Sequence, residues 1–494
     1  MIFSPWSVQK INLYSPFAPI RKIFDDFFET CKFHVFTPLA PSIYNIFIDG
    51  LIKCLREKKL GAHRLNQYAG VIILADDVAL LSTSPTELQE MLNVTQEYTR
   101  TWRYRINPSK SRIVTFNEKK QRNNTPAYTW NLGDKIIPQA NEHPHLGLTK
   151  SSTSYDPTDK MITKGTQTFY GLTGAGAYTG GLLPHHCARL WKVYCVPRML
   201  YGIAVVKLTQ AMRNKLDRAQ HQLFKKVLGL PNSVADEAVF LLTGLVPLSM
   251  QVDLETLLLI GQLVNLPHSR YEVRSLLHAI TKSIPLLRSW ERILQQYNLP
   301  DLHTLIRKPI PYSTWKTSIK GIVNSSLYRN IHQSLQTKSS LALFKNNIHI
   351  AQDLYPHSCT SKFLRQAVII RSQLVTQTYL TQSRLNTLKK TASRCCQMCK
   401  NADEDVVHFL AICPQFKSHR QILVNKLQKQ DIPKKIRRTF QPSEDPSSFT
   451  QAVLFPCHLK VKPQHRQALL SVTLSFLYQI HCARASALYH TCST

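Results

Sequence analysis

The sequence predicts an α+β protein in which a strand-containing N-terminal part precedes a long helical part and a small cysteine-rich module. Three observations lead to this prediction. Two apolar runs flank an acid pair within residues 71–82, helical patterns fill most of residues 151–300, and four of the twelve cysteines fall between Cys395 and Cys413. Strand-length runs and helical patterns that occupy separate stretches are typical of α+β chains.

The acid pair, Asp76 and Asp77, stands between two apolar runs, Val71–Leu74 and Val78–Leu81. Each run has strand length, so we expect a tight hairpin with the acids at its turn. Runs this apolar are typical of strands covered on both faces, which would leave the acids at a rim. Neighbouring carboxylates suit Mg²⁺ in phosphoryl chemistry, and a solvated acidic turn is the alternative.

Composition favours a nucleic-acid partner. The 494 residues include 62 Lys+Arg against 30 Asp+Glu, a net charge of +32, and 43% hydrophobic residues provide for packed cores. Such an excess suits a polyanion, with an anionic membrane surface as the alternative. The sequence has no run of 18 apolar residues and no visible secretory signal, so we expect a nuclear or cytoplasmic chain that neither spans a membrane nor is secreted.

The stretches around the acid pair have readable local patterns. An amphipathic helix is expected within Pro38–Ile52. Ser84 and Glu87 have the spacing of a capping box, which predicts a helix that ends near Trp102. A turn at Asn107 and a strand over Ile113–Phe116 should follow.

These motifs together resemble the reverse transcriptases of non-LTR (LINE-type) retrotransposons. Asp76 and Asp77 match the family's Ala-Asp-Asp core, although Leu74 replaces its usual aromatic residue. Lys110 matches a lysine-bearing turn, and the resemblance implies that it meets the leaving pyrophosphate. His145–Leu148 is similar to the hairpin that grips the primer end.

The helical part extends the resemblance. Leu190–Gly202 and Leu216–Leu230 are similar to a helix-turn segment and to the thumb helix of the same proteins. A thumb holds primer and template through Lys and Arg contacts to phosphates, and a plain helical domain with solvated basic faces is the alternative. Residues 316–400 carry 13 Lys/Arg against one acid, with interleaved aromatics that suit a nucleic-acid surface.

Cys396, Cys399, His408 and Cys413 have the spacing of a zinc site. Four N/S ligands fill a tetrahedron, so the zinc should be structural rather than catalytic. Three unrelated thiols and a core histidine are the alternative, and Cys395 could replace Cys396. The module resembles the Cys-Cys-His-Cys knuckle of many LINE-type proteins.

The resemblance implies a partial right-hand polymerase palm, an α-helical thumb and linker, and a zinc module. The expected division is an unassigned segment 1–35, a palm 36–150, a thumb-like region 151–300, a basic linker 301–390, the knuckle 391–420 and a basic helical tail 421–494. The implied activity is RNA-directed DNA polymerisation with two Mg²⁺ ions on an RNA template and a DNA primer or target.

One departure from the family bears on activity. The family's metal clamp includes a third aspartate on an earlier palm strand, and the 37 residues before Pro38 show no matching strand. Asp25, Asp26 and Asp49 do not fit its pattern. We therefore expect an impaired or inactive polymerase, from a truncated retrotransposon product or a partial gene model. A noncatalytic nucleic-acid-binding remnant is the second functional class, and a membrane-surface protein is the third.

Overall fold

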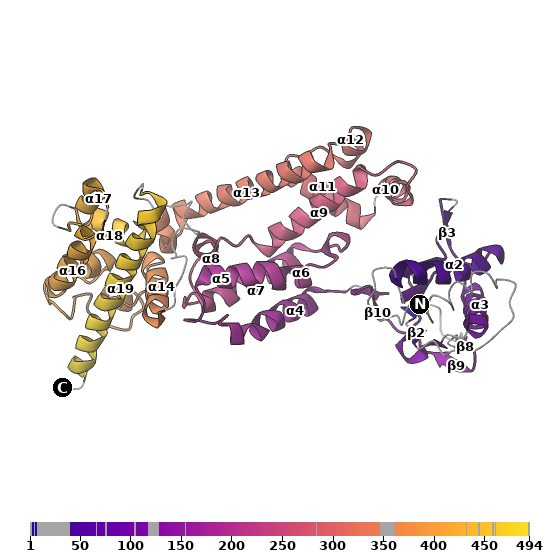
Figure 1. Ribbon diagram of the computed structural model, residues 1–494, viewed down its shortest axis with the longest axis horizontal. Coiled ribbons are helices and arrows are strands. Elements are labelled where there is room, and N and C mark those ends of the chain that lie inside the picture. Colours follow the sequence, from indigo (N-terminus) through magenta and orange to yellow (C-terminus); the bar gives the residue numbers. More distant parts are fainter. Residues whose placement is uncertain are drawn as a thin grey trace, which may run out of the picture. The chain divides into compact units, whose positions relative to one another are not determined.

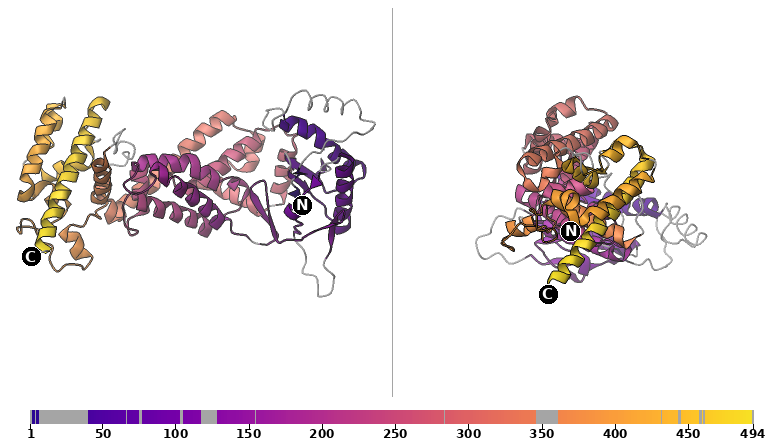
Figure 2. Two further views of the ribbon diagram at one scale, coloured as in Figure 1. Left: turned by 60° about the horizontal axis from the view of Figure 1, so that its bottom comes forward. Right: turned by 90° about the vertical axis from the view of Figure 1, so that its left-hand side faces the viewer.

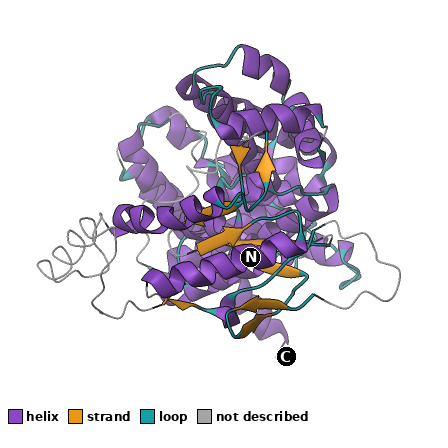
Figure 3. Ribbon diagram, turned by 90° about the vertical axis from the view of Figure 1, so that its right-hand side faces the viewer, coloured by secondary structure: helices purple, strands orange, loops and turns teal. Residues whose placement is uncertain are grey.

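The computed structural model describes residues 2–3, 5–6, 40–65, 67–74, 77–102, 105–116, 128–153, 155–282, 284–345, 361–430, 432–442, 445–456, 459 and 461–492. The chain divides into two compact units. Unit 1 comprises Met1–Pro157 and Pro267–Thr281, and unit 2 comprises Thr158–Leu266 and Lys282–Thr494. The strands of the described residues all belong to unit 1 (Figure 3).

In its described residues, unit 1 combines short antiparallel strands with three α-helices. The strands are β1 (Ile2–Phe3), β2 (Pro5–Trp6), β3 (His63–Arg64), β4 (Gln67–Tyr68), β5 (Val71–Leu74), β6 (Asp77–Leu80), β7 (Arg105–Ile106), β8 (Trp130–Leu132), β9 (Lys135–Ile137), β10 (Glu142–His145) and β11 (Leu148–Ser151). β1, β6 and β5 form a sheet in that order, and the others pair in twos. The helices are α2 (Ala40–Glu57), α3 (Pro85–Trp102) and α10 (Tyr271–Thr281).

The predicted hairpin around the acid pair is confirmed in its strands. β5 and β6 pair antiparallel, with Val71 opposite Leu80 and Leu74 opposite Asp77. Ala75 and Asp76, which separate the two strands in the sequence, lie outside the described residues.

The expected burial of the hairpin is only half correct. In the central strand β6, Val78 and Leu80 are buried, as expected. In β5, Ile72 and Leu74 are 46% and 58% exposed, so the expectation of two covered faces is wrong there. Successive side chains of a strand point to opposite faces, and in β5 one of these faces is left uncovered.

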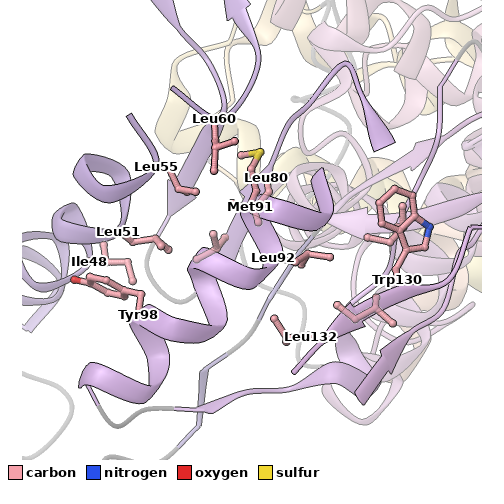
Figure 4. Packing of buried hydrophobic residues seen from close by; sticks show 13 residues of the cluster. Ile48, Leu51, Leu55, Leu60, Leu80, Met91, Leu92, Tyr98, Trp130 and Leu132 are labelled. Carbon is pink, nitrogen blue, oxygen red and sulfur yellow. The ribbon is translucent and has the colours of Figure 1, made fainter. Parts of the chain in front are cut away.

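The core of unit 1 lies between the two long helices and the strands (Figure 4). Leu51 and Leu55 of α2 and Met91 and Leu92 of α3 are fully buried within one cluster. Trp130 of β8 joins the same cluster, so the central hairpin, both helices and the β8–β9 hairpin share one core.

Two local predictions around α3 are corrected. The helix ends at Trp102 as predicted, but the Ser84 N–H donates to the Ser82 hydroxyl oxygen, at 3.1 Å, rather than to Glu87. The Glu87 carboxylate accepts instead from the Gly61 N–H, at 2.9 Å, and from the Ser82 hydroxyl. The stretch Ile113–Phe116 is not a strand, since only Ile113 makes a bridge there.

Unit 2 is helical, as predicted for most of its length. Its helices are α4 (Thr158–Gly171), α5 (Pro184–Leu190), α6 (Val196–Met199), α7 (Gln210–Val227), α8 (Asp236–Thr243), α9 (Leu248–Val264), α11 (Pro285–Gln296), α12 (Leu302–Arg307), α13 (Tyr312–Thr337), α14 (Lys362–Val375), α15 (Gln382–Thr387), α16 (Lys417–Gln428), α17 (Lys434–Arg438), α18 (Pro446–Leu454) and α19 (Pro463–Cys492) (Figure 1). α19 packs along α14 and α16 (Figure 2).

No helix of the described residues is by itself both long and apolar enough to cross a membrane. By length and composition alone, α8 and α9 would qualify as a pair, with a bend of 66° between them.

A close helix crossing joins α9 to α13. A Cβ atom at Gly261 of α9 would overlap the indole of Trp315 on α13. The indole is 2% exposed, and its N–H donates to the Leu257 carbonyl at 2.7 Å. The missing side chain of Gly261 therefore allows the contact between these helices.

A carboxylate at the start of α8 links this helix to α7. Asp236 lies 2.7 Å from the Lys225 ammonium and 2.9 Å from Nδ1 of His221. Burial acts to raise the pKa of Asp236, but the contacts with His221 and Lys225 outweigh it and hold this pKa well below its usual range.

We predict that Gly261→Ala destabilises the protein by about 1–3 kcal/mol, because the methyl group must displace Trp315. Gly321 is the matched control. It lies on α13, and a methyl group added there would have no other atom within 4 Å, so Gly321→Ala should gain about 0.5–1 kcal/mol from helix propensity. Urea unfolding of the three proteins tests both signs, and equal stability of the two variants would contradict the packing argument.

We further predict that the stability of Asp236→Asn depends less on acid pH than the stability of the parent protein does. A carboxyl whose pKa falls on folding stabilises the protein when the pH is above the pKa of the unfolded chain, 3.8. This stabilisation is lost as the pH drops from that value toward the lower pKa of the folded protein. The side chain is half exposed, so the loss at pH 7 should be about 1 kcal/mol or less. Thermal unfolding should show the difference shrinking between about pH 5 and pH 2. The exposed Asp159→Asn is the control and should show no such trend.

Candidate functional site

The carboxylate site starts from the central strand of unit 1. Asp77 is the first residue of β6 and is half buried, just before the buried Val78. Asp76 lies outside the described residues, so the structure places one member of the predicted acid pair. The strand pairing sets Asp77 at the end of the three-stranded sheet, opposite Leu74.

Lys110 lies in the same unit, on a turn that its neighbours build. The side chain of Asn107 accepts from the backbone N–H groups of Ser109 and Lys110, at 3.0 and 3.3 Å. This is the local bonding that makes Asn a turn residue. The turn Pro108–Lys110 contacts β1, which in turn pairs with β6, and Lys110 itself is exposed.

Two histidines that the sequence did not single out as a pair lie in β10. His143 and His145 are two residues apart and therefore share one face of the strand. Burial lowers the pKa of both imidazoles, Arg112 acts in the same direction on His143, and the Asp77 carboxylate partly offsets these effects. The alternation His-Pro-His was the available signal in the sequence.

The predicted primer-end hairpin has the expected shape. His145 pairs with Leu148 across a two-residue turn, in which Leu146 and Gly147 have φ angles of 51° and 77°. Left-handed angles at both positions are typical of the tight turns that match strand twist.

Of the three candidates for a third carboxylate, the structure describes only Asp49. Asp49 forms an exposed ion pair with Lys53 one turn along α2, at 2.8 Å. Asp25 and Asp26 lie outside the described residues. Among the described residues, the carboxylate and imidazole groups of unit 1 form no three-membered cluster able to hold a metal ion.

The second candidate site brings all four predicted cysteine and histidine ligands together. The ligand atoms of Cys396, Cys399, His408 and Cys413 all lie within 4.8 Å of one another. The two Sγ atoms of Cys396 and Cys413 are 3.9 Å apart, and Sγ of Cys399 is 3.4 Å from Nε2 of His408. Cys395 is outside this cluster, so the geometry selects Cys396.

Backbone bonding shapes the loop that holds these side chains. The N–H of Lys400 donates to the Cys396 carbonyl at 2.8 Å, which closes the turn between the first two ligands. A π-helical turn, His408–Ile412, then carries the chain from the third ligand to the fourth. Its first N–H donates to Asp405 Oδ1 at 2.7 Å, and the Cys413 carbonyl accepts from Arg420 at 2.7 Å.

The electrostatics of the cluster suit a bound cation. Burial lowers the pKa of His408, which leaves a neutral imidazole ready to ligate. Burial raises the pKa of Cys413 to about 12, with the neighbouring thiols acting in the same direction. A tetrahedral zinc with bonds of about 2.3 Å would separate its sulfur ligands by roughly 3.8 Å, close to the spacing found here. The donor set therefore fits a metal ion.

Comparison with known proteins finds a family match within the sequence of unit 1. Residues 27–150 match the family model described as reverse transcriptase (RNA-dependent DNA polymerase). A retrovirus-related Pol polyprotein from the type-1 retrotransposable element R2 of Popillia japonica is 27% identical over 201 residues. The match covers 39% of this chain and 32% of the relative, so the chain matches about a third of that polyprotein. The chain is therefore a reverse transcriptase-domain protein related to a non-LTR retrotransposon polyprotein.

Proposed function

We propose that this chain binds nucleic acid through a palm of the reverse transcriptase type, and that Asp76 and Asp77 are the remaining ligands for catalytic Mg²⁺. The observation that carries the proposal is the family match over residues 27–150, which contains the β5–β6 hairpin and its acid pair. The partners implied are an RNA template and a DNA primer or target. The net charge of +32 agrees with such partners, and the same proposal assigns the chain to the nucleus or cytoplasm.

The chemistry of this proposal is phosphoryl transfer. The primer 3′-hydroxyl attacks the α-phosphate of the incoming nucleotide, the hydroxyl proton is lost, and pyrophosphate leaves. Bound Mg²⁺ would neutralise charge that develops on the phosphate oxygens. Asp77 would hold the ion from the end of β6, and Lys110 would offer a positive charge or a proton to the leaving pyrophosphate.

A specific observation supports a second candidate function, binding without synthesis. Asp49 is held by Lys53 at 2.8 Å, and the described residues bring no third carboxylate to Asp77. A two-metal clamp that lacks a bridging ligand loses the in-line geometry that it must impose. The chain would then keep its basic surface as a nucleic-acid-binding protein with impaired polymerisation.

We also propose that the cluster of Cys396, Cys399, His408 and Cys413 binds one structural Zn²⁺. Its four N/S donors leave no coordination position for substrate, which is the pattern of a structural site. The ion would hold the two ends of the 396–413 loop together.

Primer extension on an RNA template with Mg²⁺ tests the polymerase proposal. A working site predicts extension by the parent protein and none by Asp77→Asn, whereas Asp49→Asn should extend like the parent. Lys110→Ala should slow the reaction by about 100-fold or more if the lysine acts as a proton donor.

RNA binding in the same samples separates the two functions. The parent and Asp77→Asn should bind RNA alike, with at least about tenfold weaker binding at about 200 mM than at about 50 mM salt. Binding with no extension by any variant would support the noncatalytic function. Weak, salt-insensitive RNA binding by the parent would contradict both.

Native mass spectrometry tests the zinc site. The parent should carry one zinc, and His408→Ala should lose it, because three donors hold the ion far less tightly than four. Cys395→Ser is the matched control, since this neighbouring thiol lies outside the cluster, and it should keep the metal. An unchanged metal content in His408→Ala would refute the assignment.

A further inference from the structure

A buried ion pair ties the metal-ligand loop to the C-terminal helix. Glu404 lies in the loop, between the second and third metal ligands, and Arg484 lies on α19. Nε and Nη2 of the arginine donate to the two carboxylate oxygens at 2.7 and 2.8 Å. Glu404 is 1% exposed and Arg484 is 7% exposed, so water screens this pair little.

Both partners have further bonds that fix their positions. The Glu404 carboxylate also accepts from the backbone N–H of Gln382, at 2.7 Å. Nη2 of Arg484 also donates to the Leu380 carbonyl, at 2.9 Å. The pair is therefore the centre of a network that joins the segment before the knuckle, the knuckle loop and α19.

Ring contacts bring the arginine next to a metal ligand. The Arg484 guanidinium lies 5.6 Å from the centre of the Tyr379 ring and 5.8 Å from that of Phe409. Phe409 directly follows the ligand His408 and stacks on Tyr379 at 5.2 Å. One turn earlier on α19, Nδ1 of His481 lies 2.8 Å from the Tyr379 hydroxyl. These contacts fix the residue beside His408 from the side of α19.

Neither partner of this pair can remain buried alone. Burying the Glu404 carboxylate without its cation costs far more free energy than burying the pair. If Arg484 leaves, Glu404 must therefore become exposed to water, so the loop and α19 change their positions together. The loop that carries Glu404 also carries the four ligand side chains, which converge when the loop has its observed shape. Any ion that binds them favours the conformation in which Glu404 meets Arg484.

We infer that α19 is part of the metal site as its outer support, with Arg484 as a positioning residue, so that metal binding and docking of α19 are coupled. The inference rests on the proposed zinc site and assigns it a partner within the chain. Linkage makes the coupling reciprocal: the metal stabilises the docked helix, and the docked helix tightens metal binding by the same factor.

Metal titration of the full chain tests whether the docked α19 tightens metal binding. Arg484→Gln should weaken Zn²⁺ binding by about 10–100-fold, the usual effect of removing an outer support, and Arg484→Lys should fall between it and the parent. Competition with a chromophoric chelator gives the affinity, and the absorption of bound Co²⁺ shows whether the ligand set is unchanged.

Arg371→Gln is the matched control. Arg371 is a buried arginine of α14 that also holds α19, because it donates to the Thr473 hydroxyl at 2.8 Å and to the Val453 carbonyl at 3.3 Å. These two bonds anchor α18 and α19 without involving the metal-ligand loop. This variant should lower the melting temperature and, because it removes no bond to the metal-ligand loop, should weaken Zn²⁺ binding less than Arg484→Gln does. Equal metal affinity in Arg484→Gln and the parent would overturn the inference.

Trypsin cleavage after Arg484 tests whether bound metal stabilises the docked α19. The bond to Ala485 should be protected in the zinc-loaded parent and cleaved at least about tenfold faster after chelation, because the arginine must leave its partners to be cut. Cleavage after the exposed Lys59 of unit 1 provides the internal reference. A parent that binds no zinc would refute the zinc proposal itself. A parent that binds zinc but shows the same cleavage rate with and without it would leave the zinc site standing and refute the coupling.

Discussion

The pairing of β6 with β1 on one side and β5 on the other fixes where this central sheet can carry charge. A central strand has both backbone edges satisfied, and Val78, Ala79 and Leu80 of β6 are buried. An ionised group is tolerated only where such a strand ends, and Asp77 stands at that position. The same core holds α2, α3 and the β8–β9 hairpin against the sheet, so the location of Asp77 follows from the packing.

A different constraint governs the cysteine cluster of unit 2. Three thiols within 4.8 Å of one another resist ionising together, and burial, with the neighbouring thiols acting in the same direction, raises the pKa of Cys413 to about 12. The loop nevertheless contributes buried groups outside the ligand set, among them Glu404. A short segment thus combines a site that attracts a cation with a carboxylate that has its own buried counter-charge.

Local sequence patterns predicted the elements whose causes are local. The apolar runs at 71–82, the periodicity of α3 and the spacing of Cys396, Cys399, His408 and Cys413 each identify residues that the structure brings together. The other features depend on contacts between residues far apart in the sequence. Glu87 bonds to Gly61, 26 residues away, rather than to its own helix start. The pairing of Glu404 with Arg484 spans 80 residues and has no signature in either segment. The predicted domain limits and the catalytic roles of Asp76, Asp77 and Lys110 stay predictions.

The crossing of α9 and α13 has a consequence for how this chain can vary. The indole of Trp315 fills the volume that any side chain at position 261 would need, and its N–H is bonded to α9 itself. The two positions therefore share a fixed volume, and neither can change size alone. In related chains, a residue larger than glycine at the first position should occur with a residue smaller than tryptophan at the second. The two positions would then appear as a covarying pair that reports helix spacing rather than catalysis.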